Sequence, residues 1–374
     1  MKSIMLLVFM SLFVSSSAQL PPADTSRNIP RVSDREGKFS IFTVVKFDNA
    51  ACTTSTGLNG TCFTAKECTN VGGSGLGTCA SGFGVCCLLS LGCDSSTSVN
   101  NTYFTGLSTL GTGTGFCQHT INKISSNVCQ IRLDFDQLVL GAPDNTGNCN
   151  SDKLIVTGSS LSVPSICGSN AGQHIYLHTG MSLSPVTITI SAMATFTTRA
   201  WMIRSSQICC DSLSRAPDGC LQYYVGSSGT FQSFNWQAAE AGLHLANQRY
   251  SICVRKEQGF CSICYTQCNT ASPQGSFSVF HGTAATFGAL TSATGTCQND
   301  FITIPCGQAT TTAATACTME RFCGGTLATT AGALTGTAVC TTVTPFVVNF
   351  FTDANENADF RSGGFCLTYS QSPC

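Results

Sequence analysis

The chain has 374 residues, of which only 10% are charged, and its formal net charge is −1. An ordinary globular domain carries about 25% charged residues. With so few charges and no basic excess, the sequence excludes the positive surface that attracts nucleic acid or anionic lipid. The 25 cysteines and the frequent Thr, Ser and Gly favour a disulfide-rich β protein, and the length predicts two or three domains.

Residues 1–18 predict a secretory signal peptide. They contain Lys2, an apolar run over residues 4–14, and small residues before Gln19. This run is too short to cross a bilayer, and no later apolar run approaches the required length. The protein is therefore expected outside the cell, where cysteines form disulfides. Residues 19–38 are polar and contain prolines, which predicts a flexible arm.

Residues 39–90 predict a small cysteine-rich module that opens with one strand, "FSIFTVVKF" (39–47). Six cysteines follow, from Cys52 to Cys87, and leave little room for an apolar core. Disulfides of about 2–4 kcal/mol each must therefore supply the stability. Cys86 and Cys87 are adjacent, and adjacent cysteines bond each other only through a strained ring. Each of the two is expected to reach a separate partner.

The rest of the chain predicts an all-β fold in two blocks, 91–206 and 207–374. Both blocks consist of short segments closed by Gly, Ser or Pro, which is the pattern of antiparallel sandwiches. In "CQIRLDFDQLVL", alternate residues from Ile131 onward share one face of a strand. The Thr/Ala/Gly stretches 282–295 and 308–339 have no apolar stripe and predict long loops.

Both blocks resemble the CUB domain family. The strings that carry the resemblance are "CQIRLDF", "NCNSDKLIVTG" and "SICG" in the first block, and "CQNDFITI", "RFCGG" and "VVNFFTDANENADFRSGGFCLTY" in the second. The whole layout is similar to a group of secreted arthropod-type proteins with a cysteine-rich segment before two CUB-like domains. Residues 39–90 also resemble the clip module found beside secreted serine proteases. The resemblance implies two CUB-like antiparallel β-sandwiches preceded by a small disulfide-rich module.

The resemblance also implies particular disulfides. The pairs that follow from it are Cys52–Cys86, Cys62–Cys79, Cys68–Cys87, Cys93–Cys129, Cys149–Cys167, Cys220–Cys253 and Cys297–Cys323. Spacing and position further suggest the pairs Cys306–Cys317 and Cys210–Cys261. The total of 25 cysteines is odd, so one sulfur is unpaired or shared between chains. Cys209 and Cys374 are the candidates for a disulfide-linked dimer.

Some CUB domains bind calcium, which prefers several hard oxygen ligands. The resemblance places Asp300 and Asp353 at two ligand positions of the second block, where no Glu stands at the third. The first block keeps only Asp152, with Gly141 about where the Glu would be. A calcium site at Asp300 and Asp353 is therefore one hypothesis. In the alternative, Asp300 satisfies a turn and Asp353 starts a solvated loop.

The sequence contains no hydrolase motif such as GxSxG, GDSGG or HExxH. His174 and His178 would share one side of a strand, but no third ligand is evident, so ordinary sheet residues are favoured over a zinc site. Cys261 and Cys264 form a Cys-x-x-Cys motif, which outside the cell favours structural disulfides. No residue is assigned to catalysis, and no cofactor is expected apart from the calcium of that hypothesis.

Two further features concern the surface. Asn59 and Asn100 begin N-glycosylation sequons and are expected on surface loops. The densest set of aromatic residues could mark a binding face, but most of it is expected to fill the sandwich core. This set is Tyr223, Tyr224, Phe231, Phe234 and Trp236.

From these features we expect a secreted, non-enzymatic protein that recognises extracellular protein or glycan, with neither nucleic acid nor a membrane span involved. Cross-linked loops and sheet faces would present the binding surface, because rigid groups lose little entropy on binding. One alternative is a structural component of extracellular matrix, cuticle or egg envelope, which predicts insolubility or disulfide-linked oligomers. Another is a non-catalytic partner in an extracellular protease cascade, which predicts capture of a serine protease or its zymogen.

Overall fold

The structure is a computed structural model that divides into two units, Met1–Asn49 and Ala50–Cys374. The predicted signal peptide and arm lie outside the described residues. Of the strand predicted over 39–47, the described part, from Val45 onward, has no regular secondary structure. The described residues are 45–107, 114–193, 198–237, 243–269, 276–279, 288–291, 297–311, 317, 319–354, 356 and 362–374.

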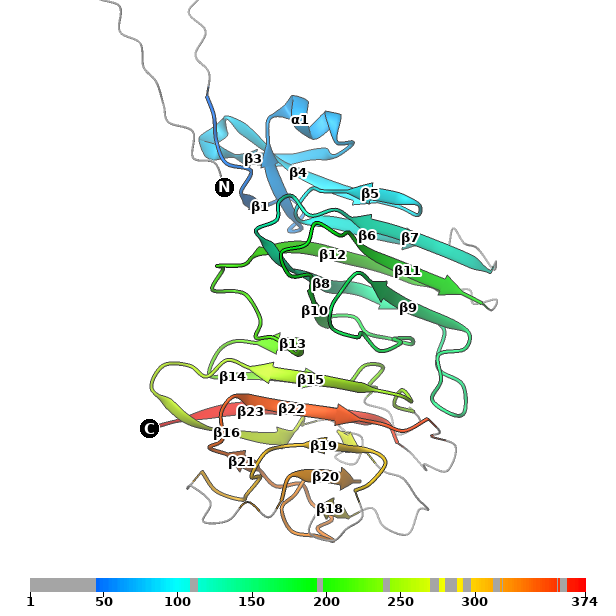
Figure 1. Ribbon diagram of the computed structural model, residues 1–374, viewed down its shortest axis with the longest axis vertical. Helices are drawn as coiled ribbons and strands as arrows, with labels where there is room; N and C mark the ends of the chain where they lie inside the picture. Colours follow the sequence, from blue (N-terminus) through cyan, green and yellow to red (C-terminus); the bar gives the residue numbers. More distant parts are fainter. Residues whose placement is uncertain are drawn as a thin grey trace, which may run out of the picture. The chain divides into compact units, whose positions relative to one another are not determined.

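The unit Ala50–Cys374 is built almost entirely of β-strands (Figure 1), so the all-β prediction is confirmed. It begins with the cysteine-rich module, whose short helix α1 starts with a capping box. The Glu67 N–H donates to Oγ1 of Thr64 (3.2 Å), and the Thr64 N–H donates to the Glu67 carboxylate (2.9 Å). The elements of this module are β1 (Ala51–Thr53), β2 (Asn59–Phe63), α1 (Ala65–Asn70), β3 (Ser74–Cys79), the 3-10 turn η1 (Ala80–Gly82) and β4 (Gly84–Leu91).

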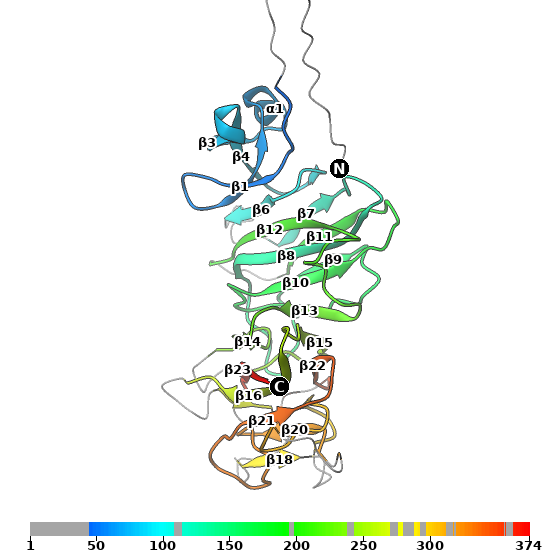
Figure 2. The same ribbon diagram turned by 90° about the vertical axis from the view of Figure 1, so that its left-hand side faces the viewer.

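The first sandwich consists of an eight-stranded and a four-stranded sheet. The larger sheet has the order β1-β2-β4-β6-β12-β8-β10, with β3 beside β4, and the smaller has the order β5-β7-β11-β9. Figure 2 shows β12, β8 and β10 as successive strands. Because β4 pairs in parallel with β6, the cysteine-rich module is hydrogen-bonded into the sandwich. The strands are β5 (Ser95–Thr97), β6 (Thr102–Leu107), β7 (Gly115–Ile121), β8 (Val128–Val139), β9 (Asp152–Thr157), β10 (His174–His178), β11 (Val186–Ala192) and β12 (Ala200–Cys209).

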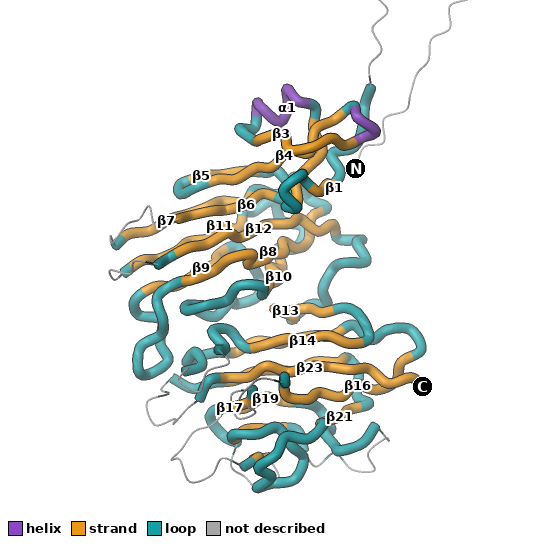
Figure 3. The backbone as a smooth tube through the Cα atoms, turned by 180° about the vertical axis from the view of Figure 1, so that it is seen from behind, coloured by secondary structure: helices purple, strands orange, loops and turns teal. Residues whose placement is uncertain are grey.

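The second sandwich consists of a six-stranded sheet, β13-β15-β22-β19-β20-β18, and a five-stranded sheet, β14-β23-β16-β21, with β17 beside β23. Figure 3 shows β14, β23 and β16 as successive strands. The stretch 282–295 was expected to be a loop, yet Ala289–Thr291 pairs with β20. The strands are β13 (Cys220–Tyr224), β14 (Ser228–Gln232), β15 (Arg249–Val254), β16 (Phe260–Gln267), β17 (Phe277–Ser278), β18 (Ala289–Thr291), β19 (Phe301–Thr303), β20 (Arg321–Gly324), β21 (Val339–Thr341), β22 (Phe346–Phe351) and β23 (Gly364–Pro373).

The alternation in β8 forms the core of the first sandwich, as its period predicts. Ile131, Leu133 and Phe135 are each 0% exposed. On the opposite face Gln130 is also 0% exposed, because the segment between the two sandwiches covers it. Its amide donates to the carbonyl of Ala216 (2.7 Å) and accepts from the Ala216 N–H (2.8 Å). The second face of β8 is therefore covered at Gln130, whereas Asp136 further along the strand is exposed.

Twelve disulfides connect 24 of the cysteines. The pairs that coincide with the expected ones are Cys52–Cys86, Cys62–Cys79, Cys68–Cys87, Cys149–Cys167, Cys220–Cys253, Cys297–Cys323 and Cys306–Cys317. The remaining pairs are Cys93–Cys117, Cys129–Cys210, Cys261–Cys374, Cys264–Cys340 and Cys268–Cys366. Cys86 and Cys87 reach separate partners, Cys52 in β1 and Cys68 in α1.

Two expected pairs are wrong. Cys93–Cys129 does not form, because Cys93 precedes β5, which pairs with the Cys117 strand β7, whereas Cys129 lies in the opposite sheet. There Cys129 bonds Cys210, at the end of the neighbouring strand β12.

The expected Cys210–Cys261 pair fails because Cys261 lies in β16, beside the end of β23, and bonds Cys374. A dimer through Cys374 is therefore also contradicted. In the part of the chain that the structure describes, Cys209 is the one free cysteine, and it is partly exposed.

The adjacent residues Cys209 and Cys210 offer a matched test of this assignment. Replacing both Cys129 and Cys210 with serine is expected to lower the free energy of unfolding by about 2–4 kcal/mol, because the unfolded chain loses a long cross-link. Cys209→Ser should leave it unchanged. The measurement is denaturant unfolding of the secreted protein. If Cys209→Ser is destabilised while the Cys129→Ser/Cys210→Ser variant is as stable as the native chain, the assignment of the Cys129–Cys210 disulfide is wrong.

Candidate functional site

A buried ion pair connects the two sheets of the first sandwich. Asp152 begins β9 of the four-stranded sheet, and Arg199 immediately precedes β12 of the eight-stranded sheet. The Arg199 Nε and Nη2 atoms lie 2.8 Å from Oδ2 and Oδ1 of Asp152, and both side chains are 0% exposed. The Gly141 N–H donates to the same Oδ2 at 2.8 Å. This bidentate geometry is the strongest form of a carboxylate–guanidinium contact.

This arrangement does not fit calcium in the first sandwich. Calcium requires six to eight oxygen ligands at about 2.3–2.6 Å, whereas both Asp152 oxygens face N–H donors. A Cβ atom at Gly141 would lie 3.1 Å from Oδ2 of Asp152, so a side chain at this position would also crowd the pair. Arg199 supplies the positive charge that balances Asp152.

The second sandwich brings together His244, Asp300 and Glu356, which are all buried. One ligand atom from each lies within 4.8 Å of the others, and Nε2 of His244 is 3.3 Å from a Glu356 oxygen. Asp300 immediately precedes β19, while His244 and Glu356 come from the loops before β15 and after β22. Asp353 takes part through its backbone, because its N–H donates to Oδ1 of Asp300 at 2.8 Å.

The sequence hypothesis thus found Asp300 but named Asp353 in place of His244 and Glu356. Glu356 lies three residues after Asp353, in a string that carries the family resemblance, and so had a visible signal. Nothing near His244 in the sequence pointed to Asp300. One imidazole and two carboxylates are typical ligands of zinc and related transition metals, while calcium prefers oxygen alone. Calcium therefore fits this set less well than a transition ion, and the calcium site stays a prediction.

A loop of the first sandwich lies over this cluster. A Cβ atom at Gly147 would stand 2.4 Å from Cγ of Glu356 and 3.0 Å from the His244 carbonyl oxygen. The Ala246 N–H donates to the Gly147 carbonyl at 2.8 Å, and the Glu356 N–H donates to the Thr146 carbonyl at 3.2 Å. The first sandwich therefore limits the access of a ligand to this cluster from that side.

The two sandwiches meet again where β10 faces β13 (Figure 1). Each is the last strand of its sheet, so each has backbone groups without a ladder partner. The Tyr223 N–H of β13 donates to Nε2 of His174 at 3.2 Å, and the Tyr223 carbonyl lies 3.0 Å from the same nitrogen. Histidine side chains of β10 thus contact the free edge of β13.

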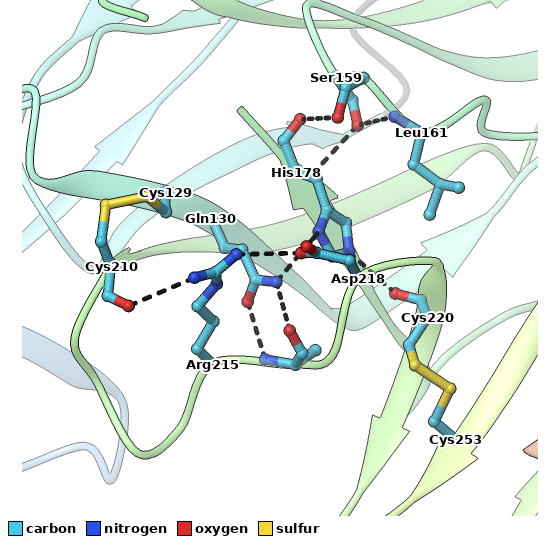
Figure 4. Close-up of polar contacts among 12 residues, drawn as sticks. Cys129, Gln130, Ser159, Leu161, His178, Cys210, Arg215, Asp218, Cys220 and Cys253 are labelled. Atoms are coloured by element: carbon cyan, nitrogen blue, oxygen red, sulfur yellow. Dashed lines mark hydrogen bonds and ion pairs between the residues drawn. A yellow bond between two sulfur atoms is a disulfide. The ribbon is translucent and has the colours of Figure 1, made fainter. Parts of the chain in front are cut away.

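Figure 4 shows the second histidine, His178, in this junction. Its Nε2 lies 3.3 Å from the Cys220 carbonyl, and its Nδ1 lies 3.2 Å from the Gln130 amide and 3.3 Å from an oxygen of Asp218. Asp218 also accepts a hydrogen bond from Arg215 at 3.0 Å. The two histidines do face one side of the strand, and that side binds the β13 backbone and the segment before it.

The sequence also singled out two glycosylation sequons and a set of aromatic residues. Asn59 was expected on a loop, but it is the first residue of β2 and pairs with Thr53 of β1. Asn59 and Asn100 are both partly buried, and Oδ1 of Asn100 accepts the Gln207 N–H at 2.7 Å. Their glycosylation stays a prediction. Of the aromatic set, Tyr223, Phe231 and Phe234 are buried, while Tyr224 and Trp236 are partly exposed.

One comparison with known protein families finds a match in the second sandwich. The family model described as the animal CUB domain matches residues 217–372. This part of the chain is thus CUB-like, within an all-β, disulfide-rich protein. No curated protein matches the sequence.

Among solved structures, the chain is similar to the CUB1-EGF-CUB2 domains of rat MASP-1, with 11% identity, 75% of this chain and 99% of that chain covered, and a TM-score of 0.24. It is also similar to the CUB1-EGF-CUB2 domain of human MASP-1/3, with 12% identity, 73% and 100% covered, and a TM-score of 0.25. For the full extracellular region of zebrafish Gpr126/Adgrg6 the identity is 9%, the coverage 75% and 36%, and the TM-score 0.24.

Breaking the buried pair should be costly. Arg199→Met is expected to lower the free energy of unfolding by about 3–5 kcal/mol, because Asp152 is left charged and buried without a partner. The double variant Asp152→Asn/Arg199→Met should recover part of this loss, since no charge remains and the Asn oxygen still accepts from Gly141. Denaturant unfolding measures both. Equal stability of Arg199→Met and the native chain would contradict the pairing.

Buried histidines should make the protein less stable in mild acid. Burial lowers the pKa of both His119 and His174 to about 4, below the ordinary value of about 6.5. Between these values the unfolded chain binds more protons than the folded chain, so stability falls as the pH drops from about 6.5 to 4. Unfolding free energies across this range measure the slope. His174→Gln should reduce the slope of stability against pH. An unchanged slope would contradict the lowered pKa of His174.

Proposed function

We propose that the chain is a secreted, non-catalytic binding protein that presents one pre-organised surface across two joined sandwiches to an extracellular protein or glycan. The observation that carries this proposal is the junction between the sandwiches. Side chains of β10 bind the backbone of β13, and the Cys129–Cys210 disulfide fixes the connecting segment to β8. A surface held in this way loses little conformational freedom when it binds a ligand.

Two other observations support this function. The match of residues 217–372 to the animal CUB domain is consistent with an interaction module. The many disulfides fit an oxidising, extracellular location. Cys209, which is free and partly exposed, favours the second candidate, a matrix component joined through intermolecular disulfides.

The test compares the intact secreted chain with the Cys129→Ser/Cys210→Ser variant. Mass spectrometry without and with reduction gives the covalent state, and each protein is then titrated against extracellular fluid from its source. The intact chain should be a soluble monomer that captures a ligand saturably, in competition with free chain, and the variant should bind it more weakly. Recovery only as multimers linked through Cys209 would support the matrix component instead. Hydrolytic turnover that survives purification would overturn the non-catalytic assignment.

A further inference from the structure

The outer face of the six-stranded sheet in the second sandwich carries a row of two stacked aromatic rings with an arginine at each end. The Cα partners of Phe351 in β22 are Arg249 in β15 and Phe301 in β19. The Phe301 and Phe351 rings stack with centroids 4.9 Å apart. The Arg249 guanidinium lies 5.4 Å from the Phe351 centroid, and the Arg321 guanidinium lies 4.4 Å from the Phe301 centroid.

A small cavity of about 140 Å³ lies at the Arg249 end of this row. Arg249, Ser251 and Phe351 of the second sandwich form one side of it, and Leu161 and Ser162 of the first sandwich form another. The cavity is thus composite, and it exists only while the two sandwiches are joined.

The polar lining of the cavity is held in place. Oγ of Ser251 donates to Oδ1 of Asn349 at 2.7 Å, and Nδ2 of Asn349 donates to Oγ1 of Thr303 at 2.8 Å. This chain of hydrogen bonds runs across β15, β22 and β19, parallel to the row of rings. It fixes the Asn349 amide at the edge of the cavity, with its oxygen already engaged.

Arg249 differs from most of the arginines that the structure describes. Arg132, Arg199, Arg204, Arg215 and Arg255 each contact an Asp or Glu. Arg249 is exposed, and among the described residues no carboxylate lies within ion-pair distance of it. Its stacking on Phe351 orients the planar guanidinium beside the cavity while its N–H donors stay accessible. Such a fork of donors matches a carboxylate group.

The cavity has room for an acidic side chain. A water-sized group needs at least about 10–15 Å³ of such space, so a cavity of about 140 Å³ accommodates the five non-hydrogen atoms of a glutamate side chain. We propose that the cavity binds an acidic side chain of an extracellular protein, with the carboxylate on Arg249 and the methylene groups against Leu161 and Phe351.

This inference rests on the proposed binding function and names the chemistry that the ligand brings to one point of the surface. N-acetyl-L-glutamate is titrated into the full chain and followed by two-dimensional NMR, beside N-acetyl-L-glutamine as the neutral analogue of the same shape. The acid should bind saturably, with a Kd on the order of 1 mM, and the amide about tenfold more weakly. Added salt should weaken binding of the acid.

Two variants locate the site. Arg249→Gln should weaken binding of N-acetyl-L-glutamate about tenfold, which is the loss of about 1.4 kcal/mol of charge-assisted hydrogen bonding. Arg255→Gln is the matched control, because Arg255 follows the same strand and already pairs with Glu257, so binding should not change. The dispersion of the NMR spectrum shows whether each variant is folded.

The outcomes separate this inference from the function on which it rests. Equal binding of the acid and its amide, or no saturable binding of either, overturns the carboxylate site without use of any variant. Tighter binding of glucuronate at the same resonances overturns the assignment to a protein side chain. If capture of the extracellular ligand persists while N-acetyl-L-glutamate fails to bind, the proposed function stands and the cavity is not its site.

Discussion

The constraint on which the rest of the structure depends is the contact between two sheet edges, β10 and β13. Edge strands normally invite pairing with another chain because their N–H and C=O groups face outward. Here His174 and His178 reach across and bind the β13 backbone, so the two edges close each other without forming one continuous sheet. The N–H of Tyr223 requires an unprotonated Nε2 of His174 as its acceptor, and burial favours this neutral form by lowering the pKa of His174 to about 4.

Although the chain has few charged residues, some of them are buried. Several of its charged groups lie inside the sandwiches. Asp152 and Arg199 join the two sheets of the first, and His244, Asp300 and Glu356 gather near β19 of the second. The first sandwich balances its buried carboxylate with a guanidinium, and the second places an imidazole among its carboxylates. The two sandwiches therefore share an architecture while they differ in how a buried negative charge is satisfied.

Much of the fold could be predicted, because strand alternation is local. The pattern around Ile131 predicts a strand with one apolar face, and the structure has it. The pairing of Cys93 could not be predicted in this way, since alternation does not tell which sheet a strand joins. Arg199 and His244 were missed for a related reason: each lies far along the chain from its carboxylate, and only the folding of two sheets brings them together.

The junction explains why the most specific surface chemistry lies between the sandwiches and not on either one. The backbone contacts of β13 bring the segment around Leu161 close to β15. Apolar side chains therefore lie beside Arg249, which has no acidic partner among the described residues. Neither sandwich alone would enclose this space. Because the Cys129–Cys210 disulfide and the histidine contacts hold the juxtaposition, the geometry of the cavity depends on the same interactions that stabilise the fold. The stability of the fold and the geometry of the cavity thus have one physical origin.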